Sequence, residues 1–155
     1  MSTVLNILWN VPCLGFVAAF FWALAGCVMA ITVIGLPWAK ACFTLANYTL
    51  APFGREVVSC RDVTGRWSLG AGGWGLLANI IWFLFVGSGL TLLHVLMACA
   101  CAITIIGIPF AWAHLKLAAY SIAPVGKVVV PSQVAAAIDR ERAADWLAGA
   151  RRRQH

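Results

Sequence analysis

Charged side chains are scarce in this chain, and acidic ones are the scarcest. Only 10% of the 155 residues are charged and five are acidic, whereas 63% are hydrophobic. The only charged side chain in residues 1–54 is Lys40, and the only one in residues 67–126 is Lys116. So little polar sequence cannot cover so large an apolar core, which argues against a soluble globular protein. Apolar stretches of about 18 residues or more indicate membrane spans, so we expect an integral membrane protein.

These two apolar blocks also lack the residues that catalysis requires. All the acidic residues lie outside them, in the polar strap (residues 55–66) or the C-terminal tail: Glu56, Asp62, Asp139, Glu141 and Asp145. A catalytic triad or an acid–base dyad needs a carboxylate beside a base. The six cysteines show neither a Cys-x-x-Cys pair nor the spacing of a zinc site. We therefore expect no catalytic residue, no metal and no cofactor.

What the chain does contain is a Gly-x-Pro break that occurs twice, at Gly35-Leu36-Pro37 and at Gly107-Ile108-Pro109. Glycine weakens a helix, and proline removes an amide donor and clashes with the preceding turn. A helix should end at each break, and a new one should begin with proline in its first turn. Gly35, Pro37, Gly107 and Pro109 are therefore predicted structural hinges.

The breaks belong to an internal repeat. Residues 31–58 align without a gap with residues 103–130, and about half of the positions are identical. Internal symmetry of this kind is typical of membrane proteins built from repeats. The predicted organisation is a first membrane repeat (1–58), a Gly-rich polar linker (59–73), a second membrane repeat (74–130) and a cytoplasmic tail (131–155).

Both repeats resemble the YccF-like inner membrane component family of bacterial membrane proteins. The resemblance rests on Val4-Leu5-Asn6-Ile7, Asn79-Ile80-Ile81-Trp82, the region of His94, residues 105–109 and residues 115–130. It covers roughly residues 3 to 130, and the first copy departs from it at Trp38-Ala39-Lys40. The resemblance implies a location in the bacterial inner membrane and no assigned activity, so it supports the architecture and leaves the function open.

We predict an all-α integral membrane protein made of two helical hairpins, with about four membrane segments. The helices are expected over residues 16–34, 37–51, 88–106 and 109–123. The preceding segments, 4–11 and 74–85, would lie in the interface or extend the first spans. Arginine and lysine near span ends mark the cytoplasmic side, so a multi-pass topology with both termini cytoplasmic is expected. The alternative has one crossing per repeat, which makes the repeats inverted.

Polar residues within the apolar blocks are the candidate functional residues, because ionisable groups in a membrane are costly. His94 shares a helix stripe with Thr91 and small residues, as a pore wall or a buried interface would; the alternative is a hydrogen-bonded packing residue. The lysines close to the breaks can snorkel to the nearer interface. The candidate pore or interface residues are His94, Thr91, Lys40, Lys116, His114 and Asn47.

The tail predicts a helix that begins near Ser132 and ends at the basic run Arg151 to Arg153. We expect Val134, Ile138 and Leu147 near one face, so that this basic amphipathic helix binds anionic lipid rather than nucleic acid. Two functions stay open. One is a homo-oligomeric pore for a small solute or ion, lined by His94. The other is a non-conducting membrane scaffold or partner-binding subunit that docks through the strap and the tail.

Overall fold

The computed structural model describes residues 2–11, 15–32, 35–65 and 73–153. Its helices are α1 (Ser2–Asn10), α2 (Gly15–Ala30), α3 (Leu36–Leu50), α4 (Cys60–Thr64), α5 (Gly73–Trp82), the π-helical turn η1 (Phe83–Gly87), α6 (Ser88–Ala102), α7 (Ile108–Ile122) and α8 (Ser132–Arg152). Its strands are β1 (Arg55–Ser59) and β2 (Lys127–Pro131). Residues 66–72 of the predicted polar linker (59–73) lie outside the described residues, and α4 and the end of β1 occupy its first part.

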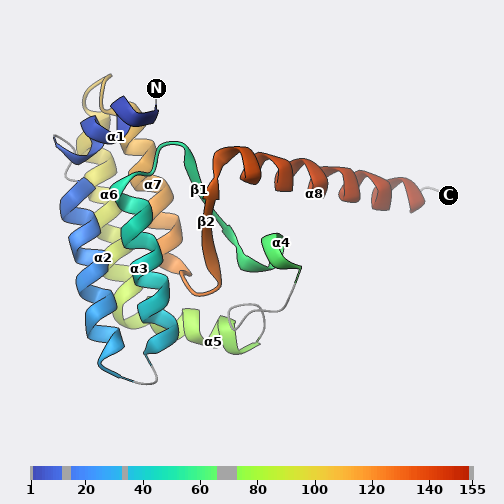
Figure 1. The fold of residues 1–155 in the computed structure, drawn as a ribbon, viewed down its shortest axis with the longest axis horizontal. Helices are drawn as coiled ribbons and strands as arrows, with labels where there is room; N and C mark the ends of the chain where they lie inside the picture. Colours follow the sequence, from blue (N-terminus) through green and yellow to red (C-terminus); the bar gives the residue numbers. More distant parts are fainter. Residues whose placement is uncertain (1, 12–14, 33–34, 66–72, 154–155) are drawn as a thin grey trace.

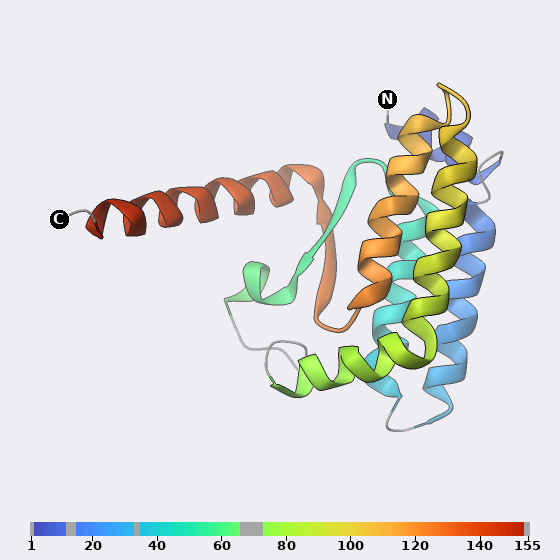
Figure 2. The ribbon, with the colours of Figure 1, turned by 180° about the vertical axis from the view of Figure 1, so that it is seen from behind.

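Four helices form the body of the molecule, as two hairpins packed side by side (Figures 1 and 2). Helix α2 packs against α3, and α6 packs against α7. Helices α3 and α7 begin and end within a residue of their predicted bounds. Helix α6 ends four residues before the predicted Ile106, because the Thr104 hydroxyl accepts a hydrogen bond from the Gly107 amide and closes a turn.

The two Gly-x-Pro breaks form the hairpin turns. A Cβ atom at Gly35 would overlap the carbonyl oxygen of Met29, and one at Gly107 would overlap the carbonyl oxygen of Cys101. Both glycines have ordinary negative φ angles, so they are required for close approach rather than for conformation. Proline follows in the first turn of α3 and of α7.

The protein is mostly helical, as predicted, but it is not all-α, because β1 and β2 form a two-stranded antiparallel sheet. The register runs from Arg55 opposite Pro131 to Ser59 opposite Lys127. Each strand begins just after a glycine with positive φ, at 90° and 86° respectively, which turns the chain out of the preceding helix. The Val-Val runs that follow favour a strand, whereas the sequence analysis included them in the membrane repeats.

The two hairpins point in opposite directions and are related by an approximate two-fold axis. Helix α2 runs down the bundle in Figure 1, whereas α6 runs up it. Equivalent residues meet on the axis: Val57 lies opposite Val129 in the sheet, and the rings of Tyr48 and Tyr120 are 5.8 Å apart.

The molecule is layered along this axis. The sheet packs against α3 and α7, and α2 and α6 form the layer on the far side. Helices α1 and α5 cross the two ends of the bundle, and α5 bends into α6 at the π-helical turn (Figure 2). Helix α8 projects from the sheet, away from the bundle (Figure 1).

One described helix is long and apolar enough to cross a membrane. It is the continuous 30-residue helix Gly73–Ala102, of whose most apolar 18 residues only 17% are buried. Helices α1 and α2 qualify together but meet at 75°. The expected membrane segments correspond to α2, α3, α6 and α7. Of these, α3 and α7 have 15 residues each and fall short of the roughly 20 that a span needs.

The tail is helical, as expected, but its apolar residues do not share one face. At 100° per residue, Val134 and Leu147 lie about 140° apart around α8. Trp146 and Leu147 are both exposed. The amphipathic part of the tail prediction is therefore wrong.

Candidate functional site

A line of three buried side chains crosses the centre of the bundle. The Trp22 Nε1–H donates a hydrogen bond to His94 Nε2 at 3.1 Å, and His94 Nδ1 lies 3.2 Å from His114 Nδ1. All three side chains are 1% exposed or less. They come from α2, α6 and α7, so the line joins the two hairpins.

These contacts determine the protonation of both histidines. Because His94 Nε2 accepts from an indole, the neutral ring carries its hydrogen on Nδ1 and donates it to His114 Nδ1. The hydrogen of His114 is then on Nε2. A second proton on His94 would set an N–H against the indole N–H of Trp22, so the line requires two neutral imidazoles.

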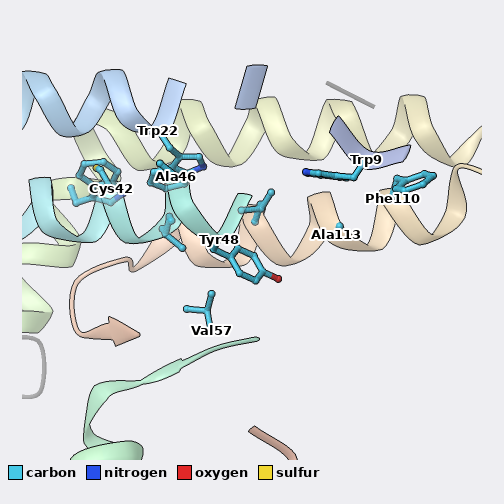
Figure 3. Close-up of a cluster of buried hydrophobic side chains, with 11 residues drawn as sticks. Trp9, Trp22, Cys42, Ala46, Tyr48, Val57, Phe110 and Ala113 are labelled. Carbon is cyan, nitrogen blue, oxygen red and sulfur yellow. The ribbon is translucent and has the colours of Figure 1, made fainter. Parts of the chain in front are cut away.

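Further tryptophans of the buried core adjoin this line, and Trp9 and Trp22 are among the core side chains drawn in Figure 3. Trp82 stacks on Trp22 with ring centres 6.1 Å apart, and the ring centre of Trp9 lies 4.6 Å from that of His114. Trp9 Nε1 donates to the Thr49 carbonyl at 2.6 Å, as Trp82 Nε1 does to the Ser121 carbonyl at 2.8 Å. Each indole N–H thus provides a hydrogen-bond donor for a carbonyl oxygen in the last turn of a helix, and the same contact occurs in both halves.

The space beside the histidines is small. A cavity of about 30 Å³ adjoins His94 and His114 and is otherwise lined by apolar side chains such as Val17, Phe21 and Met97. This is the volume of about one water molecule. Among the described residues, this cavity is therefore too small to hold a solute larger than water.

The structure separates the six candidate residues into two groups. His94, His114 and Thr91 lie inside the bundle, where the Thr91 hydroxyl bonds to the Gly87 carbonyl at 2.7 Å. The other three lie on the side of α3 and α7 that carries the sheet. Lys116 pairs with Glu56 of β1, Asn47 accepts a hydrogen bond from Arg55 at 2.8 Å, and Lys40 lines a shallow groove of about 650 Å³ that includes Val129.

A second groove, of about 420 Å³, lies between the sheet, α4 and α8. Its polar lining residues include Glu56, Asp62, Lys127, Asp139 and Arg142, and an ion pair of Arg142 with Asp62 ties α8 to α4. The sequence placed most of these residues in the strap and the tail, which the scaffold alternative assigns to docking.

One signal in the sequence pointed to the Glu56 contact. The second repeat has Val128 where the first has Glu56, and the first has Thr44 where the second has Lys116. The two residues that break the repeat at these positions, Glu56 and Lys116, are thus the two partners of one ion pair.

Comparison with known proteins places the chain in a family. The family model described as the YccF inner membrane component domain matches residues 4–55 and 77–127, together more than half of the chain. The chain belongs to the YccF family. The two segments matched by the YccF model correspond to the two halves of the bundle, and each ends where a strand begins.

Two curated relatives carry the name inner membrane protein YccF. Those of Escherichia coli K12 and of Shigella flexneri are each 37% identical to this chain over 139 residues, which cover 88% of it and 93% of the relative. This YccF-family chain is therefore an inner membrane protein. No solved structure matches it.

Proposed function

We propose that this protein is a non-conducting scaffold of the inner membrane, which presents the sheet, α4 and α8 as a docking surface for another protein. The observation that carries the proposal is the burial of His94 inside one copy of the chain. Its two ring nitrogens face Trp22 and His114, so the residue that a pore would need on its wall belongs to the core.

Other polar side chains of the bundle are used in the same way. The two tryptophan N–H groups and the Thr91, Thr49 and Ser121 hydroxyls all bond to backbone carbonyls within the chain. Such internal bonding stabilises a rigid body and leaves few polar groups to replace the hydration shell of a passing ion.

The docking surface combines charge with exposed aromatic area. Trp146 on α8 is 67% exposed, and Leu147 beside it is also exposed. Arg151 and Arg152 follow within two turns. Tryptophan and arginine are enriched among the residues that contribute most to binding between proteins. This composition favours a partner with an acidic, partly apolar surface.

A flux assay separates the scaffold from the pore. Wild-type protein in liposomes is expected to give the same ion leak as protein-free liposomes, at every oligomeric state recovered in lipid. A leak that His94→Ala alters while the variant still assembles would establish the pore and the homo-oligomer that it requires.

A photo-crosslinker at Trp146 tests the docking surface in intact cells. A crosslinking residue there is expected to give a discrete protein adduct that disappears when Arg151 and Arg152 are replaced by glutamate. The same residue at Thr3, an exposed position of α1 outside the docking surface, is the matched control and should give no such adduct. Adducts with anionic lipid alone would favour the tail as a lipid-binding helix and contradict the docking role.

A further inference from the structure

We propose that the approximate two-fold axis of the molecule lies along the membrane normal. The four bundle helices then lie nearly in the plane of the membrane, with the α2 and α6 layer bound by the lipid chains. This placement does not depend on whether the docking surface binds a partner.

The distribution of charge carries the argument. Helices α1, α2, α5 and α6 and the η1 turn contain no charged residue. Every described charge lies in the sheet, in α4, in α8 or directly after it, or on α3 and α7. Both lysines on α3 and α7 face the sheet, because Lys116 pairs with Glu56 and Lys40 lines a groove with Val129. Polarity therefore changes along the two-fold axis rather than along the bundle helices.

The apolar surface has the matching distribution. On α2, which lies in the layer farther from the sheet (Figure 1), Phe16, Phe20, Leu24 and Val28 form an exposed apolar stripe. The hairpin turns are also apolar at both ends of the bundle, with Ile31, Ile103 and Ile105 between 83% and 87% exposed. Such contiguous apolar surface on a membrane protein indicates contact with lipid.

An upright bundle would place these features unfavourably. The two turns would lie in the headgroups or water at opposite membrane faces, with their isoleucines exposed. The sheet would lie at mid-depth, with its open strand edges and the pair of Lys116 and Glu56 in hydrocarbon. Unpaired backbone groups and charges are costly there.

The hairpin turns are suited to a buried position. The Thr32 hydroxyl accepts from the Gly35 amide at 3.1 Å, and the Thr104 hydroxyl accepts from the Gly107 amide at 3.0 Å. Both threonines thus satisfy a backbone donor that a membrane interior would leave without water.

Each half then enters and leaves on the same side of the membrane. In the first half, Ser2 at the start of α1 lies beside Gly54 at the start of β1. Two helix layers separated by about 8–10 Å are roughly 20 Å thick, less than the roughly 30 Å of the hydrocarbon core. No part of the bundle reaches the far face, so the expected cytoplasmic position of both termini and the strap is retained without four spans.

Spin labels on the α2 stripe test the placement in the full chain reconstituted in lipid. Single cysteines replace Phe16, Phe20, Leu24 or Val28 in a variant without natural cysteines, and the depth of each label is measured from its accessibility to oxygen and to a water-soluble nickel complex. We expect one constant depth. An upright helix would instead show a change of about 18 Å over these twelve residues.

Cysteines at the two hairpin turns provide the second measurement. Ile31→Cys and Ile103→Cys are expected to resist a membrane-impermeant thiol reagent in intact cells and in inverted vesicles, whereas the natural Cys60 reacts in inverted vesicles only. A slope in label depth along the α2 stripe, or labelling of either turn from either side, would overturn the proposal. Labelling of the two turns from opposite sides would establish the upright bundle instead.

Discussion

Trp22 and His94 occupy equivalent positions in the two halves of the chain, and they bond to each other across the two-fold axis. One repeat contributes the donor and the other the acceptor, so the two sequences had to differ here for the contact to form. The same holds for the pair of Lys116 and Glu56. The equivalent positions of the other repeat hold Thr44 and Val128, which cannot form an ion pair. Differences between the repeats are therefore informative, because they identify contacts that a symmetric pair cannot make.

Trp22→Phe removes the indole donor and leaves His94 Nε2 buried without its partner. We expect a loss of about 1–3 kcal/mol, the typical cost of an unsatisfied buried polar group. Thermal unfolding in lipid nanodiscs measures the change. Trp112→Phe, at an exposed tryptophan, is the matched control and should leave the melting temperature unchanged. Equal melting curves for both variants would show that the bond to His94 contributes nothing.

Gly107→Ala introduces a Cβ that overlaps the carbonyl oxygen of Cys101 in the hairpin turn. Because backbone lies on the other side of the contact, the turn must shift, and overpacking of this kind costs about 1–3 kcal/mol. Gly89→Ala is the control, since the space there is open and alanine favours a helix. The thermal stability of the first variant should fall while that of the second stays or rises; the reverse order would contradict the close-approach role.

At the scale of elements, the sequence predicted what depends on local signals. Pro37 and Pro109 fixed the starts of α3 and α7, because proline acts on its own turn. The sequence did not predict the strands, because β1 is stabilised by pairing with β2, which lies far along the chain. At the central pair, Val57 and Val129 are 72 positions apart. Apolar Val-Val runs fit a span end and a strand equally well, and only the distant partner decides between them.

The candidate site was predicted in part for the same reason. The sequence identified His94 and His114 separately, as polar residues in apolar segments. Their pairing depends on how α6 packs against α7, and the contact with Trp22 depends on the opposite hairpin. The periodicity of one helix contains neither piece of information.

Helix α8 is held to the rest of the protein over its first half. Arg142 pairs with Asp62 of α4, and beyond that contact the helix is exposed over most of its length. We predict that Asp62→Asn accelerates amide hydrogen exchange over the first half of α8 and leaves the bundle unchanged. Asp139→Asn is the matched control, because that carboxylate lies 4.0 Å from Arg142 and is largely exposed. Equal exchange in both variants would mean that the ion pair does not position α8.

At the scale of the whole molecule, neither half is complete by itself. The sheet takes one strand from each half, and the central aromatic line takes residues from both. We predict that the chain divided within residues 66–72 and co-expressed as two pieces assembles into a complex that copurifies from membranes. Each piece expressed alone should be degraded. Two pieces that accumulate separately and do not associate would show that the halves are independent units.

The pairing of β1 with β2 also sets the order of events during synthesis. At about 5–20 residues per second, the 72 residues between Val57 and Val129 occupy the ribosome for roughly 4–14 seconds. Throughout that interval β1 has no partner strand, and Glu56 has no Lys116 to pair with until 60 further residues have been added. The sheet is therefore completed only when β2 emerges, so folding of this protein ends with its second strand rather than helix by helix.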